Sequence, residues 1–510
     1  MKKVNQLKVG AALSYVSLAV GNIIGILYTP IMLRLLGQSE YGLYNLSNSI
    51  IGYLGVLDFG IGNAVIRYTA KYKALEDRES ESNLYGMFII IYSILAVLVI
   101  IAGSFFVMNT HLFFSSSLTA TEMRRIQLMM ALMIFNLAIS FPFGIFGAII
   151  TAHEKFIFPK IVAIIRQILN PFIMIPLLLL GYKSLGMTVV TTCLNLLFIW
   201  VNCYYCFKIL KIKVKFKKMD FSLLKEIVGY SSFIFLNMIV DKIYWSTDQF
   251  ILGSIRGTVA VAVYSVGSTL NQYYMNFSTA ISGVFLPKVT KMVTKNVTNE
   301  ELSNLFIRTG RIQFIILSYI LCGFILVGQD FISFWAGEGY EQAYWIVLLV
   351  MIPLTVPLIQ NLGLTILQAK NMHQFRSNIY IIIAILNIIA SIPLAKIYGG
   401  VGCALATGIS MIIGNIIIIN IYYYKKIHID IPRFWLEIAK LSIPVLLSIG
   451  GVFLINKFNP LSGVINILVT GTIFTIIFAP LMWLLGMNSS EKQLFIAPIK
   501  TIRKNRREVV

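Results

Sequence analysis

The chain has 510 residues, of which 58% are hydrophobic and 12% are charged. Soluble globular domains carry about a quarter charged residues, so this composition excludes an ordinary soluble enzyme or binding domain. The net charge of +21 is strongly basic. The basic stretches 208–218 and 503–507 nevertheless adjoin apolar segments, where attraction to anionic lipid explains them. We therefore expect an integral membrane protein that contacts membrane lipids and does not bind nucleic acid.

Apolar stretches long enough to cross a bilayer recur along the whole chain. A helix needs about 20 apolar residues to cross a hydrocarbon core of ~30 Å, and about fourteen such stretches are predicted. They cover residues 11–32, 43–66, 84–107, 128–151, 158–181, 186–207, 227–253, 259–284, 312–335, 343–368, 377–397, 402–424, 437–456 and 461–486. The first is not followed by a small-residue cleavage site, so we interpret it as a retained helix. The pattern predicts an all-α integral membrane protein.

The basic residues predict the orientation of these spans. Most of the 42 Lys and Arg residues fall in the N-terminal tail, the even-numbered loops and the C-terminal tail. Cytoplasmic loops hold the excess of Lys and Arg, so both termini are predicted to be cytoplasmic. Within the predicted spans, the basic residues are Arg166 and Lys242.

The cysteines and loops indicate no cofactor chemistry. The five cysteines lie in apolar runs at positions 193, 203, 206, 322 and 403, which implies no disulfide framework. Cys203 and Cys206 form a single CxxC pair, whereas a zinc site needs four ligands. The cytoplasmic loops contain no GxxxxGK[ST] motif for a nucleotide. We expect no metal, no cofactor and no direct use of ATP.

An internal repeat predicts the domain organisation. Residues 152–177 match residues 369–394 at a constant offset, and the pair Asn170/Asn387 belongs to this match. A period of six spans is even, so the two copies share one orientation, as in alternating-access transporters with parallel repeats. The predicted parts are an N-terminal six-helix bundle (1–207), a basic cytoplasmic linker (208–226), a C-terminal six-helix bundle (227–424), two additional helices (425–486) and a basic cytoplasmic tail (487–510).

Three segments resemble a known family of transporters. They are LRLLGQSEYGLYNL (33–46), LDFGIGNAVIRYTAKY (57–72) and STDQFILGSIRGTVAVAVYSVGSTLNQYYMNFSTAISGVFLPKVTKM (246–292). These segments resemble the polysaccharide transporter family, the Wzx-type oligosaccharide flippases, which share a superfamily with MATE-type drug exporters and lipid II flippases. The resemblance extends over nearly the whole chain and implies a MATE-like fold of two six-helix bundles with two extra helices.

The resemblance also implies a function. Members of this family move undecaprenyl-diphosphate-linked oligosaccharides outward across the bacterial plasma membrane and are not enzymes. Possible partners would be a polysaccharide polymerase and other assembly proteins, and H⁺ or Na⁺ would be a candidate coupling ion. Such a substrate requires a cavity with hydroxyl, amide and aromatic groups for sugars, and with cations for the diphosphate.

The seventh and eighth spans supply polar and aromatic candidates for this cavity. In the seventh, Asn237, Asp241, Trp245 and Asp248 form a stripe along one helix face, with Tyr244 beside it. The candidates in the eighth span are Asn271, Gln272 and Tyr273. Polar and charged groups within a membrane span usually face a bundle interior or an aqueous cavity. The alternative is that Asp241 pairs with a neighbouring cation and joins two helices.

Cations are expected where the diphosphate would bind. Arg166 and Lys242 are predicted to contact phosphate or a carboxylate, and Arg67 and Lys71 are placed to meet the diphosphate at the cytoplasmic entrance. Arg67 and Lys71 would equally serve as positive-inside anchors. Asp58 lies among glycines that allow close packing or a break in the helix. It is a candidate either for binding a coupling ion or for an interhelical hydrogen bond.

Three other transporter and enzyme classes stay open at this stage. A MATE-type exporter would share the fold but should prefer an acidic cavity. A lipid II flippase would share the fold and a lipid-diphosphate substrate. A membrane-embedded glycosyl polymerase would usually display a large outer loop, and the outer loops predicted here are short.

Overall fold

The computed structural model describes residues 5–217, 221–282, 285–295, 297–370, 372, 374–458, 460–494 and 496. Over these ranges every regular element is a helix and no strand occurs. In chain order the helices are α1 (Gln6–Leu36), α2 (Gln38–Gly55), α3 (Ile61–Ala74), α4 (Arg78–Met108), α5 (Thr110–Phe114), α6 (Ala120–Ala152), α7 (Ile157–Leu179), α8 (Ser184–Tyr204), α9 (Phe221–Ile255), α10 (Thr258–Ser282), α11 (Leu286–Thr294), α12 (Asn299–Trp335), α13 (Ala343–Ile359), α14 (Asn361–Ala369), α15 (Gln374–Met411), α16 (Ile419–Tyr422), α17 (Ile431–Phe458) and α18 (Gly463–Leu481).

Local sequence signals explain where several of these helices begin. Thr119 and Glu122 form a capping box at the start of α6, and Thr298 and Glu301 form another at the start of α12. In each box the threonine and glutamate side chains accept hydrogen bonds from backbone N–H groups that the first helical turn leaves without a partner. The long apolar helices therefore begin at polar residues.

The helices agree with the all-α membrane architecture predicted from the sequence. Ten helical segments of the described chain are long and apolar enough to cross a membrane, or eleven if the bent pair α13 and α14 forms one span. One of the ten, Phe375–Ile427, covers two predicted spans and contains a break at Gly399, where φ is 59°. Helices α9 and α10 coincide with the predicted seventh and eighth spans. The all-α architecture is confirmed, and the count of about fourteen spans stays a prediction.

The contacts divide the chain into two compact units. Unit 1 consists of residues 1–266 and 384–403, and unit 2 of residues 267–383 and 404–510. Helix α9, which the repeat assigns to the C-terminal half, belongs to unit 1 by its contacts. The division into two repeated six-helix bundles with a linker and two additional helices stays a prediction.

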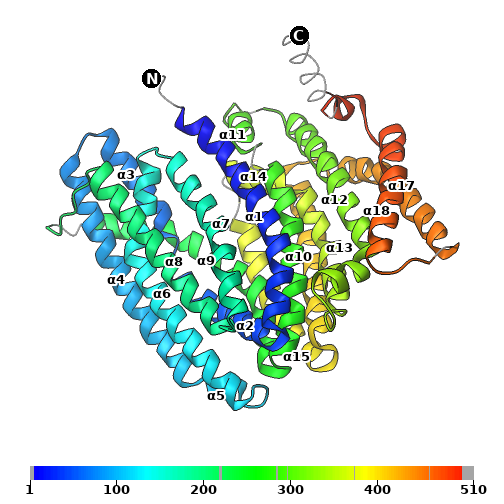
Figure 1. Cartoon of the computed structure of the whole chain (residues 1–510). Coiled ribbons are helices and arrows are strands. Elements are labelled where there is room, and N and C mark those ends of the chain that lie inside the picture. Colours follow the sequence, from blue (N-terminus) through cyan, green and yellow to red (C-terminus); the bar gives the residue numbers. More distant parts are fainter. Residues whose placement is uncertain are drawn as a thin grey trace, which may run out of the picture. The chain divides into compact units, whose positions relative to one another are not determined.

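Unit 1 is built on paired long helices. α4 packs along α6, α6 also contacts α8, and α1 packs against α7. Figure 1 shows α4 and α6 running side by side. α4 has 31 residues and α6 has 33. A helix of that size is roughly 45–50 Å long, which exceeds the hydrocarbon thickness of a bilayer.

The second predicted span is a broken helix. α2 ends at Gly55, a single 3-10 turn covers Val56–Asp58, and α3 begins at Ile61. Phe59 and Gly60 have positive φ values of 52° and 65°. Gly60 adopts the left-handed conformation without strain because it has no Cβ, whereas Phe59 adopts it at a cost in backbone strain. The break puts Asp58 in a turn between two helices.

In unit 2, α12 packs against α13, α17 and α18 (Figure 1). The buried Arg311 of α12 connects three segments. Its Nε and Nη2 donate to Glu491 at 2.6 and 2.9 Å, its Nη1 donates to Glu437 of α17 at 2.8 Å, and Nη2 also donates to the Gly486 carbonyl at 3.0 Å. This network joins the two additional predicted helices to α12.

Candidate functional site

The predicted stripe on α9 changes from exposed to buried along the helix. Asp241 is exposed, and Tyr244 and Trp245 are half-buried with their ring centroids 6.0 Å apart. Asp248 is only 2% exposed. The side chain of Asn237 lies outside the described residues. The stripe therefore combines an accessible aromatic segment with a buried carboxylate.

Hydroxyl groups surround the Asp248 carboxylate. Tyr264 of α10 donates its hydroxyl hydrogen to one carboxylate oxygen, and Ser391 of α15 donates to the other at 3.0 Å. The neighbouring Thr247 shares a hydrogen bond with Tyr53 of α2. Burying a carboxylate is costly unless its oxygens accept hydrogen bonds, and these donors meet that need. Three helices besides α9 therefore build the surroundings of Asp248.

Lys242 lies between α9 and α2. Its Nζ sits beside Gly52, where an added Cβ would be 3.1 Å from it. Within the described residues no carboxylate lies within 4.0 Å of this ammonium group. The missing side chain at Gly52 thus leaves room for a cation in the interior of a helix pair.

Arg166, the second predicted cation, lies on a different helix pair. Its side chain is exposed on α7, and its guanidinium carbon is 5.8 Å from the ring centroid of Phe198 on α8. A cation above an aromatic face is attracted by the ring quadrupole. The described contacts therefore do not bring Arg166 and Lys242 to a common position.

Asp58 is half-buried in the turn between α2 and α3. The Tyr92 hydroxyl of α4 and the backbone N–H of Gly60 lie near its carboxylate and are candidate hydrogen-bond donors to it. Both predicted roles of Asp58, an interhelical hydrogen bond and the binding of a coupling ion, stay predictions.

The predicted entrance residues Arg67 and Lys71 are both exposed on α3. The guanidinium carbon of Arg67 lies 5.6 Å from the ring centroid of Tyr68. Lys71 lies in the last turn of α3 and Arg67 one turn before it. Exposed cations there can contact an anionic group, and they also suit an anchor at a membrane surface. Both interpretations stay open.

The amides predicted on α10 occupy two different faces. Asn271 is 1% exposed and lies on the same face as Tyr274, which bonds Thr355 at 2.8 Å. Gln272 is exposed and donates to Asn276 at 3.2 Å, and Tyr273 is half-buried. The cluster therefore consists of a packed face and an accessible face rather than a single lining.

A polar pocket that the sequence interpretation missed lies inside unit 1. Its volume is about 180 Å³. The lining comes from α2, α6 and α8 and consists of Tyr44, Asn48, Ile51, Met133, Asn136, Leu137, Ser140, Thr188, Thr191, Thr192 and Asn195. Asn195 donates to both Asn136 and Ser140 at 2.7 Å. None of the lining residues is charged, so the pocket offers neutral donors and acceptors within apolar helices.

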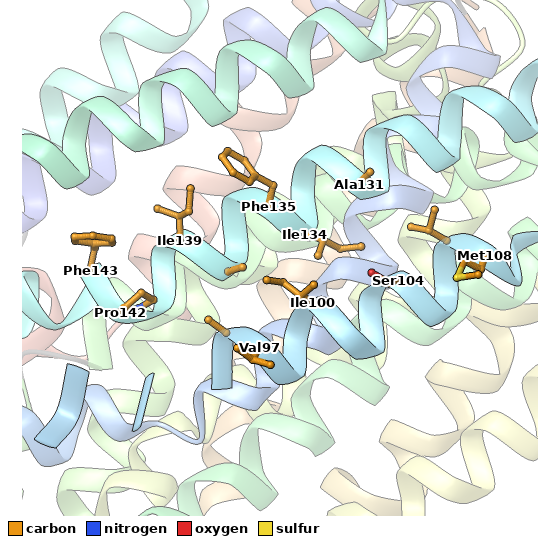
Figure 2. A pocket seen from close by; sticks show the side chains of 13 residues that line it. Val97, Ile100, Ser104, Met108, Ala131, Ile134, Phe135, Ile139, Pro142 and Phe143 are labelled. Atoms are coloured by element: carbon orange, nitrogen blue, oxygen red, sulfur yellow. The ribbon is translucent and has the colours of Figure 1, made fainter. Parts of the chain in front are cut away.

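An apolar pocket lies between α4 and α6. Its volume is about 630 Å³. Figure 2 shows Val97 and Ile100 of α4 near Ile134 and Ile139 of α6, with Ser104 as a polar lining side chain. Such a surface suits the hydrocarbon chains of lipids rather than sugars.

Comparison with known proteins identifies the family. A family model described as "Polysaccharide biosynthesis protein" matches residues 7–293. The chain is 23% identical over 335 residues to a protein of Shigella flexneri named "Putative O-antigen transporter", covering 63% of this chain and 75% of that one. It is 20% identical over 246 residues to the "Probable low-salt glycan biosynthesis flippase Agl15" of Haloferax volcanii, covering 48% of this chain and 51% of that one.

Solved structures show the same fold at low identity. The inward closed conformation of the lipid II flippase MurJ matches with a TM-score of 0.75 and 17% identity, covering 96% of this chain and 99% of that one. An inward-facing MATE family multidrug transporter matches with a TM-score of 0.59 and 15% identity, covering 80% and 96% of the two chains. These matches confirm the predicted MATE-like fold. The relatives are transporters and flippases rather than enzymes, and this chain belongs to the polysaccharide biosynthesis protein family, as its resemblance to the Wzx-type flippases predicted.

Proposed function

We propose that this chain is a flippase that moves undecaprenyl-diphosphate-linked oligosaccharides from the inner to the outer leaflet of the bacterial plasma membrane, for the assembly of a surface polysaccharide. The family match supports a role in polysaccharide biosynthesis, and two relatives are named "Putative O-antigen transporter" and "Probable low-salt glycan biosynthesis flippase Agl15". In this proposal both termini are cytoplasmic, transport proceeds by alternating access, and H⁺ or Na⁺ is the coupling ion. A polysaccharide polymerase and other assembly proteins are the proposed partners.

The polar pocket among α2, α6 and α8 is the observation that carries the proposal. Sugar hydroxyls both donate and accept hydrogen bonds, so they are matched by amide and hydroxyl side chains. A cationic drug would instead require a carboxylate, and the pocket lining contains none. The pocket lies halfway along α6 and α8, where a polar group facing lipid would be costly. The chemistry therefore favours a sugar-bearing substrate over a drug cation.

The other predicted site residues have defined roles in this proposal. Lys242 and Arg166 contact the diphosphate at successive stages, because they lie on different helix pairs. Arg67 and Lys71 attract the diphosphate at the cytoplasmic side. Further proposed sugar contacts come from α9 and α10 and are Asn237, Asp241, Tyr244, Trp245, Asp248, Asn271, Gln272 and Tyr273.

The test is export by variants of the polar pocket. The double variant N136L/N195L replaces two amides by apolar groups of similar size, and we expect surface polysaccharide to fall at least tenfold while the protein still inserts. The lost bonds to sugar are worth roughly 1 kcal/mol each, and the newly apolar surface cannot solvate sugar hydroxyls. The matched control is Asn170→Leu on α7, outside the pocket lining.

Two results would contradict the proposal. One is normal surface polysaccharide in N136L/N195L at normal membrane abundance. The other is proteoliposome transport of lipid II without transport of lipid-linked oligosaccharide, which would place the chain with the lipid II flippases instead.

A further inference from the structure

A large charged pocket lies at one end of unit 1, outside the set of residues proposed for transport. It has a volume of about 810 Å³. It is lined by the end of α3, the start of α4, His153 after α6, and residues 210–215 of the predicted linker. This volume lies within the range of small-molecule sites, which runs from about 300 to 1,000 Å³.

The linker forms one wall because it is held on α4. Residues 211–217 have no helical structure. The backbone N–H of Lys215 donates to the Ser82 carbonyl at 3.0 Å, and the Lys215 carbonyl lies where a Cβ at residue 86 would be. Only glycine at position 86 permits this approach, so the contact is specific to the present sequence.

Glutamates around the pocket are largely engaged within the protein. Glu81 accepts from the Tyr85 hydroxyl at 2.5 Å and lies 3.2 Å from His153 Nε2. Glu79 lies 3.7 Å from Lys215 Nζ. Glu76, the third glutamate of the lining, is exposed. Two of the three carboxylates therefore already interact with a hydrogen-bond donor or a cation of the protein itself.

The cations of the pocket outnumber these carboxylates. Besides Lys215, the lining includes Lys73, Arg78, Lys211 and Lys213. In the part of the chain that the structure describes, none of these four lies within 4.0 Å of a carboxylate oxygen. Holding several like charges around one space is unfavourable unless water, salt or an anionic ligand compensates them.

We propose that this pocket binds a phosphate or diphosphate group, with Lys73 on α3 and Lys211 and Lys213 on the linker as its principal contacts. Lysine ammonium groups bind phosphate oxygens by charge-assisted hydrogen bonds, and Arg78 adds a planar guanidinium that can contact two oxygens together. The group belongs either to a soluble phosphate ester or to a lipid headgroup at the membrane surface. Binding joins the linker to α3 and α4, so an occupied pocket holds the segment between the two predicted halves.

The binding test uses the full-length protein in nanodiscs of phosphatidylcholine, with inorganic pyrophosphate as the probe and calorimetry as the readout. We expect saturable binding that weakens at least tenfold in K73Q/K211Q/K213Q, because the loss of even one charge-assisted bond to a phosphate costs about an order of magnitude in affinity. The matched control K291Q/K425Q/K426Q removes the same charge from exposed residues of unit 2 and should bind as the unchanged protein does.

A second variant tests the linker without changing any charge. Gly86→Ala places a Cβ against the Lys215 carbonyl and should displace the linker, so pyrophosphate binding should weaken here too. The control is Gly144→Ala, where an added Cβ meets nothing within 4 Å. If Gly86→Ala does not fold, the lysine variant decides the question by itself.

Nanodiscs that also contain phosphatidylglycerol distinguish the two sources of phosphate. Competition with pyrophosphate assigns the pocket to a lipid headgroup, and its absence assigns it to a soluble anion. The proposal is overturned if the unchanged protein shows no saturable binding in phosphatidylcholine, or if the control triple variant weakens binding as much as K73Q/K211Q/K213Q. Neither outcome depends on transport, so the proposed flippase function is tested separately.

Discussion

The two compact units each bury a charged side chain among apolar helices, but they satisfy it differently. In unit 2, Arg311 is 4% exposed and bonds to two carboxylates and a carbonyl. In unit 1, Asp248 is 2% exposed and accepts hydrogen bonds from the hydroxyls of Tyr264 and Ser391. An arginine held by two opposite charges is fixed in place, whereas hydroxyl hydrogens can rotate to suit either a charged or a neutral partner. We therefore propose that Arg311 belongs to the structural scaffold and that Asp248 takes part in transport.

The largest effect is expected when the Arg311 network is broken. Arg311→Met leaves Glu491, which is 1% exposed, without its bidentate partner. Removing one member of a buried ion pair costs about 3–5 kcal/mol, because the remaining charge is uncompensated. Thermal unfolding in detergent should show this loss. The matched control, Arg308→Met, changes an exposed arginine of the same helix and should alter stability by less than about 0.5 kcal/mol.

The double variant R311M/E491Q sharpens the same measurement. It removes the uncompensated charge as well as the arginine, so it should recover part of the stability lost in Arg311→Met. If Arg311→Met unfolds at the same temperature as the unchanged protein, the Arg311 network does not stabilise the fold.

Unlike Arg311→Met, Asp248→Asn should have a large effect on transport and a small effect on stability. The amide keeps the shape of the carboxylate, and the hydroxyls of Tyr264 and Ser391 can still donate to its oxygen or accept from its nitrogen. We expect a loss of about 1 kcal/mol or less. Surface polysaccharide should fall severalfold at normal abundance of the protein. Normal export by Asp248→Asn, measured beside abundance, would assign this carboxylate to packing.

Labelling of α9 should separate the two ends of its polar stripe. Cysteines at positions 241 and 248, placed singly in a cysteine-free chain, should react at different rates with a small polar thiol reagent, because Asp241 is exposed and Asp248 is buried. We expect at least tenfold faster reaction at position 241, since buried thiols are inert. Ile239 and Ile243, which lie off the stripe, are the matched positions for comparison. Equal rates at 241 and 248 would show that a continuous aqueous path reaches both residues.

The residues discussed above show which features could be predicted from the sequence and which could not. Apolar runs located the helices because this signal is local. Helical periodicity predicts that Asp241, Trp245 and Asp248 share one face of α9, and this segment is helical in the structure. It did not reveal that Asp248 is buried, because Ser391 lies 143 residues away in the chain. The glycines around Asp58 had indicated a packing contact or a break, and the structure has a break there.

The polar pocket of unit 1 was missed for a related reason. Its residues come from three helices, and Asn136 and Asn195 lie 59 positions apart. Each helix alone shows a few polar residues of the kind that also join helices by hydrogen bonds, so no single stretch predicts a pocket. Only the packing of α2, α6 and α8 brings the amides together.

The smallest expected effect is the contribution of His153 to the pH dependence of stability. Burial and then the charge of Lys73 lower the pKa of His153 below its usual value, and the charge of Glu81 opposes them. The unfolded chain therefore binds a proton at a higher pH than the folded protein does, so the free energy of unfolding should fall as the pH decreases through about 6.5. His153→Gln cannot take up this proton and should lose less stability between pH 7 and pH 5.5. Thermal unfolding at the two pH values should reveal a difference on the order of 1–2 °C.

The carboxylates Glu79 and Glu81 are present in both proteins, so the comparison isolates the histidine. A larger loss of stability in His153→Gln than in the unchanged protein would mean that Glu81, rather than burial and Lys73, dominates the titration of this ring.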